Sequence, residues 1–142
     1  MEIANFASIL TAMEKVRWGF IGAGYIAKLA LYPALLNSND GEIYAVGSKD
    51  IDRGKSLSPS GLVYTDYDEL LADPKVEAIY ISLPNSLHIE WSIKAMRAGK
   101  HVLCEKPAAM DVAQLKEAIA VANETGLIFM EASWNRWHPR TI

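Results

Sequence analysis

A short glycine motif limits the folds open to this chain more than any other feature. An apolar segment over residues 16–21 leads directly into Gly22, Gly24 and Ala27, in the pattern Gly-x-Gly-x-x-Ala, and a helical pattern follows. In such a strand–turn–helix unit the first glycine makes a tight turn and the second lets a ligand approach the main chain. The small third residue lets helix and strand pack closely. The motif predicts a βαβ unit with a phosphate-binding turn over residues 22–27.

The rest of the chain repeats this alternation of strand and helix. Strands are predicted at residues 16–21, 43–47, 62–64, 78–83, 101–104 and 127–132, and helices at 25–36, within 50–61, and at 66–73, 87–98 and 111–125. Alternation of this kind is typical of a parallel sheet with helices on both faces. We therefore predict an α/β, doubly wound Rossmann fold with strand order 3-2-1-4-5-6. Its ligands would bind beyond the carboxyl ends of the strands.

Composition excludes several classes of protein. The chain has 142 residues, enough for one domain with a buried core, and its net charge of −3 leaves no basic stripe for nucleic acid. No apolar run reaches the roughly 20 residues that cross a bilayer. The three histidines and the single cysteine, Cys104, lack the spacing of metal ligands. One cysteine allows no internal disulfide, so we expect a cytoplasmic protein in which Cys104 is a small buried residue.

The chain divides into two unequal parts. Residues 13–142 contain every predicted strand and form the predicted nucleotide-binding domain. Residues 1–12 precede it as an extension with apolar side chains at helical spacing. This extension is predicted to be either a short amphipathic helix or a disordered arm.

The end of the second predicted strand indicates which dinucleotide binds. NAD-binding proteins usually place an acidic residue there, which hydrogen-bonds the ribose 2′-hydroxyl. Here Ser48 and Lys49 follow the strand, and Asp50 comes next. A hydroxyl and an ammonium favour a 2′-phosphate, so we predict NADP. NAD remains the alternative if the loop turns Asp50 inward. For Lys49 the alternative is a solvated surface residue.

Two further loops lie at the predicted carboxyl edge. Pro84 and Asn85 follow the fourth strand, and His88 in the next helix is predicted either to contact a ribose or to be a structural partner. Glu105 and Lys106 follow the fifth strand. An ammonium at this edge can orient a substrate oxygen, stabilise developing charge or join a proton relay. A surface ion pair between the two side chains is the alternative.

The segment Cys104-Glu105-Lys106-Pro107, together with the glycine turn, resembles the Gfo/Idh/MocA oxidoreductase family. Residues 83–88, 98–107 and 131–139 are similar to further segments of that family, and the resemblance runs from about residue 15 to the C-terminus. The ending Ser48-Lys49-Asp50 is most similar to the NADP-using branch that includes dihydrodiol and sugar dehydrogenases. The residues predicted to contact the coenzyme are Gly22, Gly24, Tyr25, Ile26, Ala27, Ser48, Lys49, Leu83, Pro84, Asn85, His88, Glu105, Lys106, Pro107 and Arg136.

The resemblance implies an activity and an incomplete site. It implies hydride transfer between a nicotinamide and a sugar, polyol or diol, with Lys106 as a catalytic residue. It also implies a second α+β domain that supplies most of the substrate pocket. That domain is absent here, so we expect a truncated chain, inactive alone, whose uncovered sheet favours a homodimer. The alternatives are a module or subunit that binds NAD(P) without catalysis, and a remnant that only dimerises.

Overall fold

The sheet follows the predicted topology. The computed structural model describes residues 14–141, and the predicted extension of residues 1–12 lies outside them. Within that range, parallel strands are hydrogen-bonded in the order β3-β2-β1-β4-β5-β6. They are β1 (Val16–Ile21), β2 (Gly41–Gly47), β3 (Val63–Tyr64), β4 (Ala78–Ile81), β5 (His101–Cys104) and β6 (Phe129–Glu131). The predicted Rossmann fold is confirmed.

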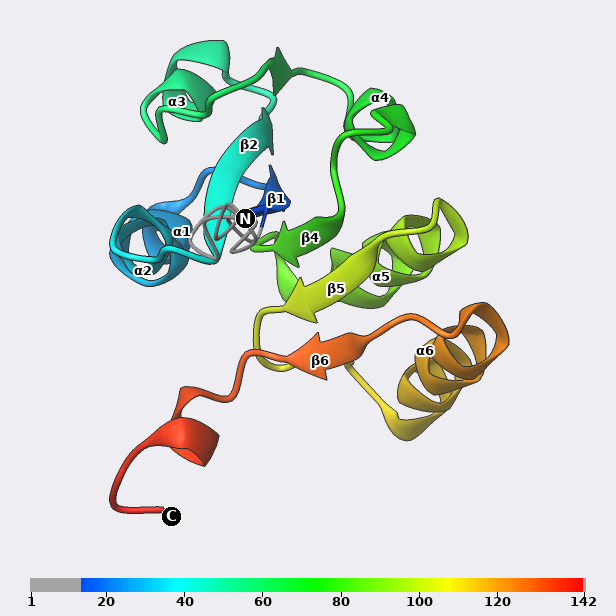
Figure 1. Cartoon of the computed structure of the whole chain (residues 1–142). Helices are drawn as coiled ribbons and strands as arrows, with labels where there is room; N and C mark the ends of the chain where they lie inside the picture. The colour runs from blue at the N-terminus through cyan, green and yellow to red at the C-terminus, as the bar shows by residue number, and fades with distance from the viewer. Residues whose placement is uncertain (1–13, 142) are drawn as a thin grey trace, which may run out of the picture.

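Helices flank the sheet on both faces (Figure 1), with α1, α2 and α3 on one side and α4, α5 and α6 on the other. Their bounds are α1 (Tyr25–Leu29), α2 (Leu31–Leu36), α3 (Ile51–Lys55), α4 (Tyr67–Ala72), α5 (His88–Arg97) and α6 (Val112–Thr125). Two 3₁₀ turns, η2 (Asn85–Leu87) and η3 (Trp134–Trp137), complete the described chain. No helix of residues 14–141 is both long and apolar enough to cross a bilayer.

The single helix predicted over residues 25–36 is wrong in one respect, because the structure divides it into α1 and α2. The break falls at Ala30, with φ −105° and ψ −79°. Pro33 has no N–H to donate to the carbonyl of Leu29, and its ring crowds that carbonyl. The helix therefore breaks at Ala30 and restarts at Leu31, two residues before the proline.

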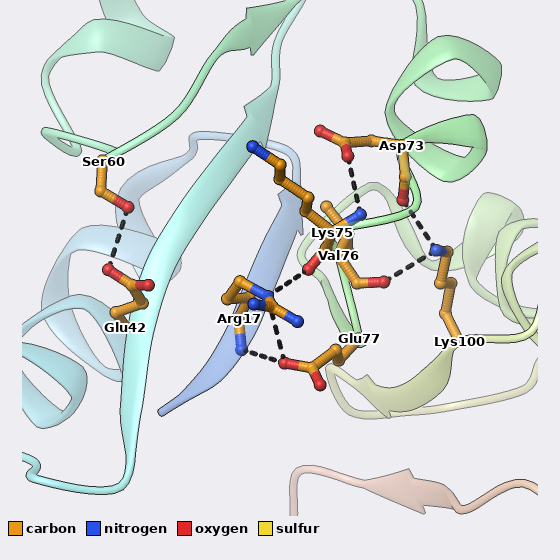
Figure 2. A network of polar contacts seen from close by, with 8 residues as sticks. All are labelled: Arg17, Glu42, Ser60, Asp73, Lys75, Val76, Glu77 and Lys100. Atoms are coloured by element: carbon orange, nitrogen blue, oxygen red, sulfur yellow. Dashed lines mark hydrogen bonds and ion pairs between the residues drawn. The ribbon is translucent and has the colours of Figure 1, made fainter. Parts of the chain in front are cut away.

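A buried lysine, Lys100, lies just before β5 and bonds to the turn that precedes β4 (Figure 2). The Nζ of Lys100 donates to the main-chain oxygens of Asp73, at 2.8 Å, and Val76, at 2.7 Å. Burial lowers the pKa of this ammonium, while the carboxylates of Asp73 and Glu77 act in the opposite direction. These bonds fix the turn between α4 and β4 at the edge of the sheet opposite to the glycine turn.

Tyr64 gives the fold a testable dependence on alkaline pH. Its hydroxyl donates to Asp73 Oδ2 at 2.9 Å. Burial, followed by this hydrogen bond, raises the Tyr64 pKa from 10.0 to about 12. The unfolded chain therefore loses the tyrosine proton first, and the stabilisation by Tyr64 is lost as pH rises from about 10 to about 12.

We expect Tyr64→Phe to lower the free energy of unfolding by about 1 kcal/mol at neutral pH. Urea unfolding at about pH 8 and about pH 11 should show the gap between wild type and variant narrowing. A gap that stays constant or widens would contradict the assignment.

Candidate functional site

The turn after β1 has the geometry that its glycines predict. Gly22 adopts φ +97°, and its N–H donates to the Gly47 oxygen at 2.9 Å. A Cβ at Gly22 would lie 2.8 Å from the Ser82 carbonyl oxygen. No other residue fits this position without moving the main chain of the neighbouring loop. The first glycine therefore holds β1, β2 and the loop after β4 together.

The second glycine leaves open space where a ligand can approach. A Cβ at Gly24 would meet no atom within 4 Å, although Gly24 directly precedes α1. Ala27 is fully buried against the sheet, so the third motif position packs as predicted. Tyr25 is 79% exposed, and its side chain points away from the core. The turn thus presents main-chain N–H groups beside unfilled space, an arrangement suited to a phosphate group.

A cleft of about 310 Å³ lies over this turn. The segments after β1, β2 and β4 form its walls, which agrees with the rule that ligands bind at the carboxyl ends near the reversal of strand order. Its lining residues are Gly22, Ala23, Gly24, Ser48, Lys49, Asp50, Arg53, Tyr67, Ser82, Leu83 and Pro84.

The charges at one end of the cleft favour an anion. The side chains of Lys49 and Arg53 are exposed, and Lys49 Nζ lies 4.9 Å from the centre of the Tyr67 ring. Asp50 is directed toward α3, where its Oδ1 accepts from the Arg53 N–H at 3.0 Å. Its Oδ2 lies 4.0 Å from Arg53 Nε. Ser48 is buried, and its Oγ accepts from the Asp50 N–H at 3.2 Å.

Sequence reasoning missed Arg53 and Tyr67 in the lining of this cleft. Arg53 lies in the short helix α3, which follows β2 in the chain, and Asp50 caps that helix. The start of a helix immediately after Ser48 and Lys49 was the available signal. Tyr67 begins α4 and reaches the cleft from a distant part of the sequence. No local pattern indicated that contact.

His88 is engaged by the protein itself. The side chain is 1% exposed, and its ring nitrogens lie 2.8 Å from the main-chain oxygens of Pro107 and Leu83. No ring nitrogen is left to contact a ribose, so the structure favours the structural alternative. Asn85, in contrast, is exposed at the start of η2, next to Pro84 in the cleft wall.

Glu105 and Lys106 do not form the alternative surface ion pair. Glu105 is 8% exposed, its Oε1 accepts from the Tyr80 hydroxyl at 2.7 Å and its Oε2 accepts from the Lys106 N–H at 3.2 Å. Burial and the Glu105 carboxylate raise the pKa of Tyr80. Lys106 is exposed, precedes a cis peptide bond to Pro107, and has no ion pair among residues 14–141. Its ammonium is therefore available at the carboxyl edge.

A second, mostly apolar hollow of about 810 Å³ lies on the α1–α2 face of the sheet. In Figure 1 no helix of the described residues covers β5 and β6 on that side. Ile26 and Leu31 form one wall, and Glu105 and Lys106 lie among its lining residues. The hollow therefore extends along the sheet as far as Lys106, the lysine at the carboxyl edge.

Two other predicted residues have different outcomes. Cys104 is fully buried, and burial raises its thiol pKa to about 12, as fits a small packed residue rather than a nucleophile. Arg136 lies in the turn η3, but its side chain is outside the described part of the structure. Its predicted contact with the coenzyme stays a prediction.

The turn, the cleft and the lysine at the strand ends define a dinucleotide-binding domain of an oxidoreductase. Residues 16–133 match the family described as "Oxidoreductase family, NAD-binding Rossmann fold". The chain belongs to this family, the Gfo/Idh/MocA oxidoreductases, and the resemblance seen in the sequence is confirmed.

Relatives with stated activities share this domain. The chain is 40% identical over 115 residues to a 1,5-anhydro-D-fructose reductase of Ensifer adhaerens, covering 79% of this chain and 34% of the relative. It is 35% identical over 128 residues to the trans-1,2-dihydrobenzene-1,2-diol dehydrogenase of Bos taurus, covering 87% and 38%. A crystal structure of a 3-ketoreductase from Actinomadura kijaniata with NADP and TDP-benzene matches with a TM-score of 0.86 and 40% identity, covering 89% and 40%. The chain therefore spans about two fifths or less of each relative.

Proposed function

We propose that this chain binds NADP(H) and is the nucleotide-binding domain of an oxidoreductase that acts on a sugar, polyol or diol. The observation that carries this proposal is the cleft over Gly24, which Lys49 and Arg53 line and in which the Asp50 carboxylate accepts from the Arg53 N–H. The NADP complex of the related ketoreductase supports the choice of coenzyme, and the reductase and diol dehydrogenase support the substrate class. A nicotinamide coenzyme supplies hydride chemistry when bound.

The chain's own residues have distinct roles in this proposal. The main-chain N–H groups after Gly22 bind the diphosphate, because Gly24 leaves them uncovered. Ser48, Lys49 and Arg53 bind the 2′-phosphate at the end of β2. The segments 25–27, 83–85 and 105–107 border the remaining length of the dinucleotide, and Arg136 is a further candidate contact.

Lys106 is the proposed catalytic residue. Its ammonium orients the substrate oxygen and stabilises negative charge on it during hydride transfer. Glu105 forms no ion pair with that ammonium among residues 14–141, and its oxygens accept from the Tyr80 hydroxyl and the Lys106 N–H. The second domain implied by the family resemblance would supply the further acid–base residue, and the predicted cytoplasmic location stays a prediction.

Titration of the purified chain with NADPH and NADH, followed by coenzyme fluorescence, tests the proposal. We expect saturable binding of both, with NADPH tighter by at least about tenfold. Tighter binding of NADH would overturn the choice of coenzyme, and no binding of either would overturn the proposed function. Turnover of a polyol by the isolated chain would exclude the alternative of a domain that binds without catalysis.

The apolar hollow favours a second proposal, that the chain alone forms a homodimer through this face. Ile128 and Trp134 line it with 62% and 71% of their surfaces exposed. Large exposed apolar patches commonly mark protein–protein contacts.

We expect Ile128→Asp to shift the chain to monomer by raising the dimer dissociation constant at least about tenfold. Val112→Asp is the matched control, since Val112 is 67% exposed on α6, outside the hollow. Sedimentation equilibrium measures both. Equal effects of the two substitutions would contradict a dimer through this face.

A further inference from the structure

The main-chain N–H groups on either side of Pro107 both donate to glutamate side chains. The Lys106 N–H donates to Glu105 Oε2 at 3.2 Å. The Ala108 N–H donates to Glu131 Oε2 at 2.9 Å. Pro107 itself has no N–H, so the segment from Lys106 to Ala108 has both of its main-chain donors bound to carboxyl oxygens.

Each of these glutamates binds a hydroxyl group through its other oxygen. Glu105 Oε1 accepts from the Tyr80 hydroxyl, and Glu131 Oε1 accepts from the Ser133 hydroxyl, both at 2.7 Å. Tyr80 is 1% exposed, so packing fixes the position of its hydroxyl. In both pairs the hydroxyl therefore orients a carboxyl group whose second oxygen holds the lysine segment.

The two glutamate side chains reach this segment from opposite faces of the sheet. Glu105 lines the apolar hollow, as do Met130 and Ala132 on either side of Glu131. Side chains alternate between the faces of a strand, so Glu131 points to the other face. Its register partner Cys104 is likewise buried among residues of α5 and α6. The segment that carries Lys106 is therefore held from both faces.

We propose that Glu131 is a positioning residue that fixes the place of Lys106 through the Ala108 N–H, opposite to the Tyr80–Glu105 pair. Glu131 needs no contact with coenzyme or substrate in this role, which rests on the proposed function of Lys106. The place of the lysine matters because a displacement of about 1 Å in a reacting group can lower a rate about 100-fold.

Glu131 has the chemistry that this role needs. The hydrogen bond from the Ala108 N–H, followed by that from the Ser133 hydroxyl, lowers the Glu131 pKa. The side chain is therefore a carboxylate at neutral pH, and hydrogen bonds to an ionised acceptor are roughly twice as strong as those between neutral groups. Because the Ala108 bond runs from β6 to the loop after β5, it fixes that loop relative to the sheet.

Amide hydrogen exchange in the whole chain without coenzyme tests the hold on the loop. Glu131→Ala should make exchange at Ala108 at least about tenfold faster and leave Ala118 in α6 unchanged. Glu131→Gln keeps an oxygen that accepts from Ala108, so its exchange should stay within about threefold of wild type. Unchanged exchange at Ala108 in Glu131→Ala would overturn the inference.

Glu77→Ala is the matched control. Glu77 Oε2 also accepts from a main-chain N–H, that of Arg17 at 3.0 Å, but at the opposite edge of the sheet (Figure 2). This substitution should leave exchange at Ala108 unaffected. If Glu131→Ala does not fold, Ser133→Ala removes only the hydroxyl that orients Glu131, and it should still make Ala108 exchange at least about threefold faster.

The acylation rate of the Lys106 amine, measured by mass spectrometry, tests the positioning role. Saturating NADPH should slow acylation of Lys106 in the wild type at least about fivefold relative to Lys116, an exposed lysine on α6. In Glu131→Ala this protection should fall below about twofold although NADPH still binds, and Glu131→Gln should restore it. A loss of stability alone would change the rates of Lys106 and Lys116 together.

The two measurements separate this inference from the proposed function. Equal protection of Lys106 in wild type and Glu131→Ala would overturn the positioning role and leave the proposed function intact. Bound NADPH that does not protect Lys106 in the wild type would overturn the positioning role as well. No binding of NADPH by the wild type would overturn the proposed function, and exchange at Ala108 would then still decide whether Glu131 holds the loop.

Discussion

Alanine at Gly24 is expected to weaken NADPH binding by at least about tenfold while changing the free energy of unfolding by less than about 1 kcal/mol. Gly24 has extended backbone angles, φ −78° and ψ −175°, which alanine adopts without strain. The added Cβ meets no protein atom within 4 Å, so it occupies the space proposed for the diphosphate. The substitution therefore acts on the ligand and not on the fold.

Alanine at Gly22 is expected to act mainly on the stability of the fold. There the Cβ would lie 2.8 Å from the Ser82 oxygen, and φ is +97°. Steric strain and an unfavourable backbone conformation together should lower the free energy of unfolding by about 2–4 kcal/mol. Substitution of one glycine of the motif should therefore reduce NADPH binding, and substitution of the other should reduce the free energy of unfolding.

Urea unfolding and NADPH fluorescence titration of both variants distinguish these effects. Measurements of binding should be made well below the unfolding midpoint of the Gly22→Ala protein, so that only folded chains are compared. If Gly24→Ala binds NADPH like wild type, the diphosphate does not approach this turn. If Gly22→Ala is as stable as wild type, the main chain at Ser82 can move aside at little cost in free energy, and the predicted steric strain is wrong.

Local patterns predicted the fold because each signal lies within one element. The apolar run of β4 is buried at every position, and Asp111, where the last helix is predicted to begin, caps α6 by accepting from the Gln114 N–H at 2.9 Å. The division of the helix at Ala30 also has a local signal, because Pro33 lacks an N–H and its ring crowds the preceding turn.

The sequence predicts those site residues that come directly after a strand, but not the contacts between distant segments. Ser48, Lys49 and Lys106 follow directly from the strands that precede them. The Tyr80–Glu105 bond joins neighbouring strands β4 and β5, and the two bonds of His88 join segments on either side of α5. Such partners depend on strand register and helix placement, which a single sequence does not specify.

Loss of the two cations at the end of β2 is expected to abolish the preference for NADPH. The double substitution of Lys49 and Arg53 by alanine removes two charged donors from the cleft. At about 1 kcal/mol for each exposed donor, NADPH affinity should fall roughly 30-fold. NADH has no 2′-phosphate, so its affinity should change by less than about threefold.

Comparison of both coenzymes in the same variants isolates the 2′-phosphate contact. Lys55→Ala is the matched control, because Lys55 is exposed on the same helix but does not line the cleft. Raising ionic strength should weaken NADPH binding by the wild type more than by the double variant, since screening acts on the charges that the variant lacks. A parallel loss of NADH affinity would show that Lys49 and Arg53 bind a part common to both coenzymes. In that case Asp50, freed from Arg53, would be the residue to examine for the ribose.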